Sequence, residues 1–174
     1  MCASGIRREN GRMYIKDIQV DILKDMCRVE PKHKVYYEKE SEYATIVCVD
    51  GFLFHVFPED LLFLDVKKMK ELHGNVISRN IQEVQNDEET LKYKGEIEVV
   101  SNRGKKQELI KLYHTENDVV TYVDRALTKY FNFGHPNVRL STKRASNVSC
   151  VLVYEGGQLV GGVLPCRHIE TSEA

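Results

Sequence analysis

Histidine and cysteine are the side chains in this sequence that could carry acid–base, nucleophilic or metal chemistry. The chain has 6 histidines and 5 cysteines, and no two cysteines stand at CxxC spacing. A structural zinc site needs four ligands at a recognisable spacing. Cys166 and His168 offer only two, on one face of an expected strand end. The sequence therefore predicts no metal site and no bound cofactor.

A cysteine nucleophile is the other chemistry that these residues could support. Residues far apart in sequence can assemble a thiol, a base and an orienting group, and Cys48 or Cys150 with His55 would supply the first two. Both cysteines lie in apolar runs expected to be strand cores, where a thiol is usually inert. The glycine-rich segments match neither a phosphate-binding loop nor a dinucleotide fingerprint. We therefore expect no catalytic residues, and an enzyme with an unrecognised site is kept as an alternative.

The composition is typical of an ordinary globular protein. Of the 174 residues, 42% are apolar and 29% are charged, and the formal net charge is −1. This length suits one domain with a core. A protein that binds phosphate nonspecifically is usually clearly basic, so a nucleic-acid role needs a local basic patch. No run approaches the roughly 20 apolar residues of a membrane span, and the odd cysteine count indicates reduced thiols in a cytoplasmic protein.

The spacing of apolar residues predicts the elements that position these side chains. Recurrence at three- and four-residue steps predicts helices over 17–30, 59–73 and 118–132. Alternation and turn signals predict strands over 13–16, 35–39, 43–49, 52–57, 96–100, 108–113, 137–142, 149–154 and 158–165. The polar segment 79–95 is expected to be mainly a loop.

Together these elements predict one α+β domain over 13–168, with antiparallel sheets, packed helices and two loosely similar strand–helix–strand halves. A flexible leader over 1–12 and a frayed tail over 169–174 are expected on either side. Asp50-Gly51 predicts a tight hairpin, and alternation after it places His55 on one strand face with Leu53 and Phe57. Gly161-Gly162 inside a strand indicates a bulge or a close approach of another backbone.

Several short segments resemble one domain of the bacterial DNA polymerase sliding clamp, the β clamp. The sequence reads VVTYVDRAL from Val119, VRLST from Val138, SCVLVYEGG from Ser149 and LPCR from Leu164. The family has a YLLDAL-type helix, a VRIEL-type strand, an SPVLI strand and a closing MPMR at these places. In the first half, MYIKDIQVDILKDM resembles the opening strand and helix, and TIVCVDGFLFHVF resembles the TDGYRL hairpin. The resemblance implies a clamp-like fold and a non-catalytic role, in association with DNA or DNA-replication proteins, as a homo-oligomer.

Local charge and this resemblance give the candidate site residues. Basic side chains would bind the phosphates of double-stranded DNA without regard to its base sequence. The candidate residues for this contact are Arg125, Lys129, Arg139, Lys143 and Arg144. The family also implies a groove for short peptides of replication proteins, and the matching residues are Leu164, Pro165, Cys166 and Arg167. The simpler interpretation is solvated turns and an edge strand packed on its own core.

The sequence departs from the clamp family in two respects that concern DNA. A clamp subunit has three such domains, and this chain has room for one. Clamp helices that face DNA are basic, whereas the helix expected over 17–30 carries Asp17, Asp21 and Asp25, which would repel phosphate. Two functions therefore stay open: a clamp-like domain that associates with DNA or replication proteins, and a protein-interaction or regulatory domain with that fold and no DNA binding.

Overall fold

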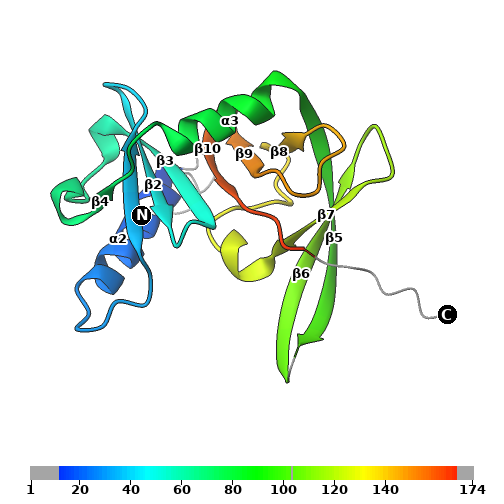
Figure 1. Ribbon diagram of the computed structural model, residues 1–174, viewed down its shortest axis with the longest axis horizontal. Coiled ribbons are helices and arrows are strands. Elements are labelled where there is room, and N and C mark those ends of the chain that lie inside the picture. The colour runs from blue at the N-terminus through cyan, green and yellow to red at the C-terminus, as the bar shows by residue number, and fades with distance from the viewer. Residues whose placement is uncertain (1–11, 103, 168–174) are drawn as a thin grey trace, which may run out of the picture.

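A computed structural model describes residues 12–102 and 104–167, and within them one ten-stranded sheet dominates a mixed α/β structure (Figure 1). The helices described are α2 (Arg12–Met26) and α3 (Val76–Asn86), with short 3-10 turns η1 (Glu59–Leu61), η2 (Val66–Lys68) and η3 (Arg125–Thr128). The strands are β1 (Val35–Lys39), β2 (Ala44–Val49), β3 (Leu53–Pro58), β4 (Lys70–Glu71), β5 (Glu88–Asn102), β6 (Lys105–His114), β7 (Val120–Asp124), β8 (Val138–Lys143), β9 (Val151–Glu155) and β10 (Gln158–Val163). Their order is β4-β1-β2-β3-β10-β9-β8-β5-β6-β7, antiparallel throughout except for the β1–β4 pair.

Six strands curl round a shared apolar core and form what we call the six-strand unit. β10, β9, β8, β5, β6 and β7 are consecutive in the sheet, and Tyr122 of β7 forms a bridge with Cys166, just after β10. The Cys166 N–H donates to the Tyr122 carbonyl over 2.7 Å, so the two ends of the run meet. Inside, Leu112, Val151 and Val153 are 0% exposed. The contact protects part of an edge strand that would otherwise stay open.

The two helices cover opposite faces of β1–β3. α3 buries Ile81 and Val84 in a cluster with Phe54 of β3. α2 buries Ile22 in a cluster with Phe57 of the same strand. Residues three apart on a strand point to opposite sides, so the sheet lies between the helices. No helix in the described ranges is long and apolar enough to cross a membrane.

Buried polar side chains attach each helix to the sheet and its connections. Glu38 of β1 is 1% exposed and accepts the N–H groups of Ile77 at 3.1 Å and Ser78 at 2.8 Å. These donors belong to the first turn of α3, where helical N–H groups lack internal partners and a carboxylate is favoured. Gln19 of α2 is 0% exposed and accepts the Phe63 N–H at 2.8 Å. Both helices are thus held by specific contacts as well as by apolar packing.

The predicted hairpin and glycine features are confirmed. β2 and β3 pair antiparallel through a turn in which Asp50 has φ 55° and Gly51 has φ 75°. The β9–β10 register shifts just before Gly161, and a Cβ on Gly161 would lie 2.4 Å from the Phe54 carbonyl oxygen. The strand is therefore irregular here and also has another backbone close to it. Glycine is required because no side chain fits.

Two of the predicted helices are wrong. Residues 59–73 form η1, η2 and β4, because their backbone donors find side-chain partners in place of helical carbonyls: Asp65 accepts the Lys67 N–H, and Gln19 of α2 accepts the Leu64 N–H at 3.3 Å. Residues 118–132 form β7 and η3, because the β-branched run from Val119 favours a strand over the helical spacing also present. The family's YLLDAL-type helix thus corresponds to a strand and a short turn in this chain.

The N-terminal strand and the central loop are also predicted wrongly. Residues 13–16 continue α2 rather than forming a strand, and α2 ends at Met26, four residues before the predicted end. Residues 79–95 contain most of α3 and the start of β5 rather than a loop. The helix was concealed because only Ile77, Ile81 and Val84 are buried within an otherwise polar segment. Of the leader predicted over 1–12, Arg12 begins α2 instead, and residues 1–11 lie outside the described residues, as does the tail over 169–174.

Candidate functional site

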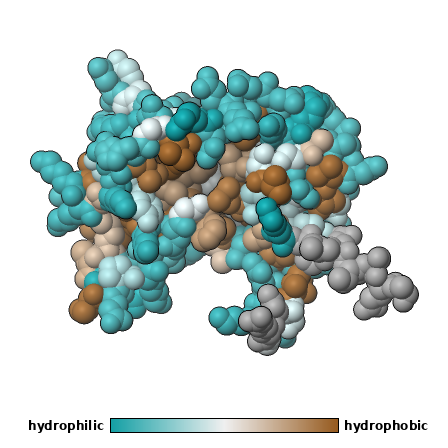
Figure 2. Space-filling model, in the orientation of Figure 1, coloured by the Kyte–Doolittle hydropathy of each residue, from teal (hydrophilic) through white to brown (hydrophobic). Residues whose placement is uncertain are grey.

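A pocket of about 670 Å³ lies where α2, the β2–β3 hairpin and η3 come together. Its apolar lining comes from these three places and from the first residue of β1, and it consists of Ile22, Val35, Val49, Phe52, Leu53, Ala126 and Leu127. On the face of the molecule drawn in Figure 2, hydrophobic side chains gather toward the middle and hydrophilic ones surround them. A pocket of several hundred Å³ with mainly apolar walls is typical of small-molecule sites.

Two aspartates fix the outer wall of this pocket. Asp25 near the end of α2 accepts the backbone N–H groups of Lys32 and His33, each at 3.0 Å. Asp50 in the hairpin turn accepts the Lys34 N–H at 2.7 Å and lies 2.5 Å from His33 Nδ1. Burial raises the pKa of Asp25, but the two backbone donors outweigh burial and leave that pKa below its ordinary value. The short segment before β1 is therefore held between helix and hairpin.

His55 lies on the floor of the pocket and is 1% exposed. Its ring is surrounded by Phe57, Tyr130 and Phe131, with ring centroids 5.7, 6.0 and 5.4 Å away. Within the described part of the chain, its Nδ1 has no hydrogen-bond partner. Burial lowers the pKa of His55 to about 3, so the ring is neutral at physiological pH. The floor thus carries no charge.

The structure does not bring the candidate cysteine nucleophiles to His55. Cys48 and Cys150 belong to the apolar cluster under α3, whereas His55 points to the opposite face of β3. Burial raises the pKa of both thiols, that of Cys150 to about 11. A thiol that stays protonated is a poor nucleophile.

The basic residues predicted to contact DNA each lie beside a carboxylate. The pairs are Arg125–Glu108 at 2.8 Å, Lys129–Asp21 at 3.3 Å, Arg139–Glu88 at 2.5 Å, Lys143–Glu83 at 3.2 Å and Arg144–Asp87 at 3.0 Å. Arg139 and Lys143 lie on β8 with Arg144 just after it, whereas Arg125 and Lys129 lie on η3 and directly after it. The structure therefore divides the predicted site between two places and neutralises much of its charge.

The segment predicted to form a peptide groove is joined to the protein's own strands. The Leu164 N–H donates to the Phe52 carbonyl at 2.8 Å, and the Cys166 N–H donates to Tyr122. Leu164 is 38% exposed, and Arg167 is exposed. Pro165 and Cys166 are half-buried. These residues thus connect the β2–β3 turn with β7.

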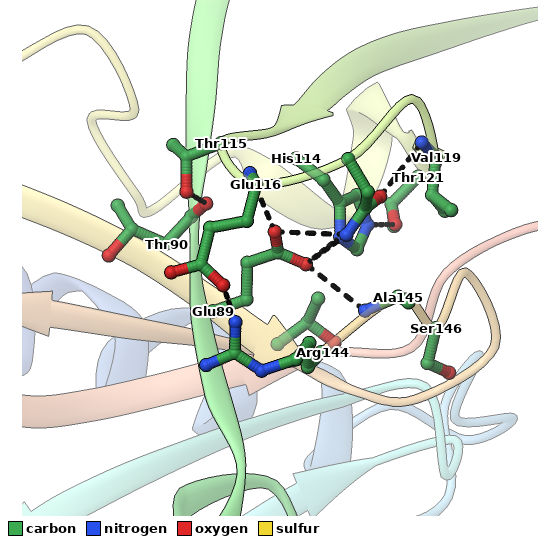
Figure 3. A network of polar contacts seen from close by, with 12 residues as sticks. Glu89, Thr90, His114, Thr115, Glu116, Val119, Thr121, Arg144, Ala145 and Ser146 are labelled. Carbon is green, nitrogen blue, oxygen red and sulfur yellow. Dashed lines mark hydrogen bonds and ion pairs between the residues drawn. The ribbon is translucent and has the colours of Figure 1, made fainter.

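A separate polar cluster, which the sequence did not indicate, lies inside the six-strand unit (Figure 3). His114 Nδ1 is 2.7 Å from Glu89 Oε1, and His114 Nε2 is 2.8 Å from Thr121 Oγ1. Glu89 also accepts the N–H groups of Glu116 at 2.8 Å and Ala145 at 3.0 Å. Thr121, His114 and Glu89 are thus linked in the order hydroxyl, base and acid, as in a catalytic triad. Thr121 is 0% exposed, however, so its hydroxyl is inaccessible to a substrate.

Comparisons with protein-family models, curated proteins and solved structures gave no match. Among the described residues, no three His, Cys, Asp or Glu side chains are grouped so that they could hold a metal ion. The fold and the site define a sheet-dominated α/β protein with an apolar pocket at a junction of elements.

Proposed function

We propose that the protein is a non-catalytic binding module and that its pocket holds the apolar part of a small ligand. The observation that carries this proposal is the pocket of about 670 Å³ with walls from Ile22, Leu53 and Leu127. Covering apolar surface contributes roughly 25 cal/mol per Å². A ligand that fills the pocket would therefore be stabilised mainly by the hydrophobic effect.

The polar groups around the pocket support binding rather than catalysis. A general base must reach its proton within hydrogen-bond distance and have a pKa near the working pH. The pKa of His55 is about 3, which is far below neutrality. Both oxygens of Asp25 accept backbone N–H groups. One oxygen of Asp50 accepts the Lys34 N–H, and the other contacts the His33 ring. These carboxylates hold the wall in place and are engaged by the protein itself.

A clamp-like role with DNA or replication proteins is the second candidate. β8, β9 and β10 lie where the sequence resemblance expects strands, which favours a clamp-like second half. The resemblance also expects a helix where the chain has β7 and η3, and the candidate DNA contacts lie beside carboxylates. These two observations favour a binding module without DNA contact.

A neutral apolar dye tests the proposal. Phenylnaphthylamine becomes fluorescent in apolar surroundings, and we expect saturable binding to the wild-type protein. Ala126 lines the pocket and is exposed, so Ala126→Trp should fill the space and weaken binding by about tenfold, or about 1.4 kcal/mol. Asn80→Trp, at an exposed position on α3, is the matched control and should bind like wild type. No saturable binding, or equal binding by Ala126→Trp, would contradict the proposal.

A further inference from the structure

The acidic groups at the mouth of the pocket are already engaged by the protein. Asp21 contacts the Tyr130 hydroxyl and lies 3.3 Å from the Lys129 ammonium. Asp25 and Asp50 accept backbone N–H groups from the segment before β1. Their negative charge is therefore largely offset by local donors.

The basic groups at the same mouth are not balanced in this way. Lys24 and Lys32 line the pocket and are exposed. No carboxylate of the described residues lies within 4.0 Å of either ammonium. Arg28 also lines the pocket; its guanidinium is 4.0 Å from Asp25 and its side chain is 52% exposed. The uncommitted charge at the mouth is therefore positive.

The interior and the mouth favour opposite ends of a ligand. Leu53 and the neutral ring of His55 line the interior, where an ion would lose its hydration without gaining a partner. Burying an unpaired ion costs several kcal/mol. An anionic group would instead stay at the mouth, in contact with water and near the lysine ammonium groups. The apolar body of the same molecule would lie inside.

We infer that the ligand is a small amphiphilic anion, with an apolar body in the pocket and a carboxylate or similar group beside Lys24 and Lys32. The inference rests on the proposed function, because it names the class of ligand for the same pocket. A carboxylate at the mouth would accept charge-assisted hydrogen bonds from these ammonium groups, and such bonds are stronger than neutral ones.

Two dyes that share one ring system distinguish the contribution of the ligand's charge to binding from that of its apolar body. Anilinonaphthalenesulfonate is phenylnaphthylamine with an added sulfonate, so the pair differs by one negative charge. We expect wild-type protein to bind the sulfonate about tenfold more tightly. The double variant Lys24→Gln, Lys32→Gln should remove that preference, so that the two dyes bind with similar affinity. Lys16→Gln, Lys34→Gln is the control, since those lysines belong to α2 and the same segment but not to the lining.

Salt gives a second readout that does not depend on substitution. Exposed charge interactions are screened as ionic strength rises, so binding of the sulfonate should weaken while binding of the neutral dye does not. If both dyes bind equally, or the lysine variants leave sulfonate binding unchanged, the inference is overturned and the apolar pocket stands. If neither dye binds, the proposed function fails, and this inference fails with it.

Discussion

Glu89 Oε1 and His114 Nδ1 lie 2.7 Å apart, and both side chains are 0% exposed. The two residues belong to β5 and β6, and the backbone donors of Glu116 and Ala145 reach the same carboxylate from two loops. The pair therefore connects strands and loops inside the six-strand unit. Because no water replaces a lost partner at such a site, the pair should contribute to stability rather than to chemistry.

Removing His114 should destabilise the protein strongly. His114→Ala removes one of the buried partners of the Glu89 carboxylate and leaves the Thr121 hydroxyl without its partner, and we expect the free energy of unfolding to fall by about 3 kcal/mol. Urea denaturation followed by circular dichroism measures the change. His73→Ala, at an exposed histidine, should change it by less than about 0.5 kcal/mol. Equal stability of the two variants would show that the buried pair contributes little.

Acid should destabilise the fold in part through His55. The pKa of His55 is about 3 in the folded state and 6.5 in an unperturbed chain. The unfolded chain therefore takes up the proton first, so this contribution is complete above pH 6.5 and is lost as the pH falls toward 3. His55→Phe should reduce the slope of unfolding free energy against pH by up to about 1.4 kcal/mol per pH unit. An unchanged slope between about pH 6 and pH 4.5 would rule out a neutral, buried His55.

The Glu89 carboxylate should add to acid sensitivity at lower pH. Burial raises its pKa, but hydrogen bonds from Ala145, His114 and Asn117 outweigh burial and leave the pKa below its ordinary value. The contribution is present above the unfolded pKa of about 4.3 and is lost as the pH falls through the lower folded value. Glu89→Gln should therefore be less stable than wild type at neutral pH and should approach it in strong acid. A constant difference at every pH would contradict this assignment.

Gly161 should not tolerate a side chain. A Cβ there would lie 2.4 Å from the Phe54 carbonyl oxygen and 2.8 Å from the Phe131 ring. We expect Gly161→Ala to lower the free energy of unfolding by about 1–3 kcal/mol, the usual range for overpacking. Because Phe131 also contacts His55, binding of the neutral dye should weaken as well. Gln158→Ala, at an exposed position on the same strand, is the control, and equal melting temperatures of both variants would argue against the close approach.

Duplex DNA should not bind appreciably at physiological salt. The candidate cations on η3 and β8 lie beside carboxylates, so few are available to displace counterions from phosphate. Fluorescence anisotropy of a labelled duplex measures this directly. Binding that weakens steeply with salt and disappears in Arg125→Glu with Lys129→Glu would instead support the clamp-like candidate.

Local sequence signals predicted the parts of the site that depend on neighbours in the chain. Asp50-Gly51 predicted the hairpin, and period-two alternation predicted the face that His55 shares with Leu53. The pocket itself could not be predicted in this way. It requires α2 and η3 to meet the hairpin, and the contact between Asp21 and Tyr130 joins residues 109 positions apart.

The buried polar cluster was hidden for a similar reason. Glu89 and His114 are 25 positions apart and have no motif spacing; the β5–β6 register, in which Leu91 faces His114, brings them together. The segment from Val119 fits both a helical stripe and a strand, and its β-branched residues decide for the strand once β6 provides a partner. Strand pairing in the folded protein therefore determines the secondary structure of this segment, which the spacing of its residues left ambiguous.

Methyl NMR of the protein with phenylnaphthylamine tests the pocket most directly. If the dye occupies the proposed site, the methyl signals of Ile22, Leu53 and Leu127 should shift with one saturating dissociation constant. The methyl signals of Ile77 and Ile81, which belong to α3 on the other face of the sheet, should not shift. Shifts confined to the α3 cluster, or no saturable shift in the three pocket residues, would contradict the account.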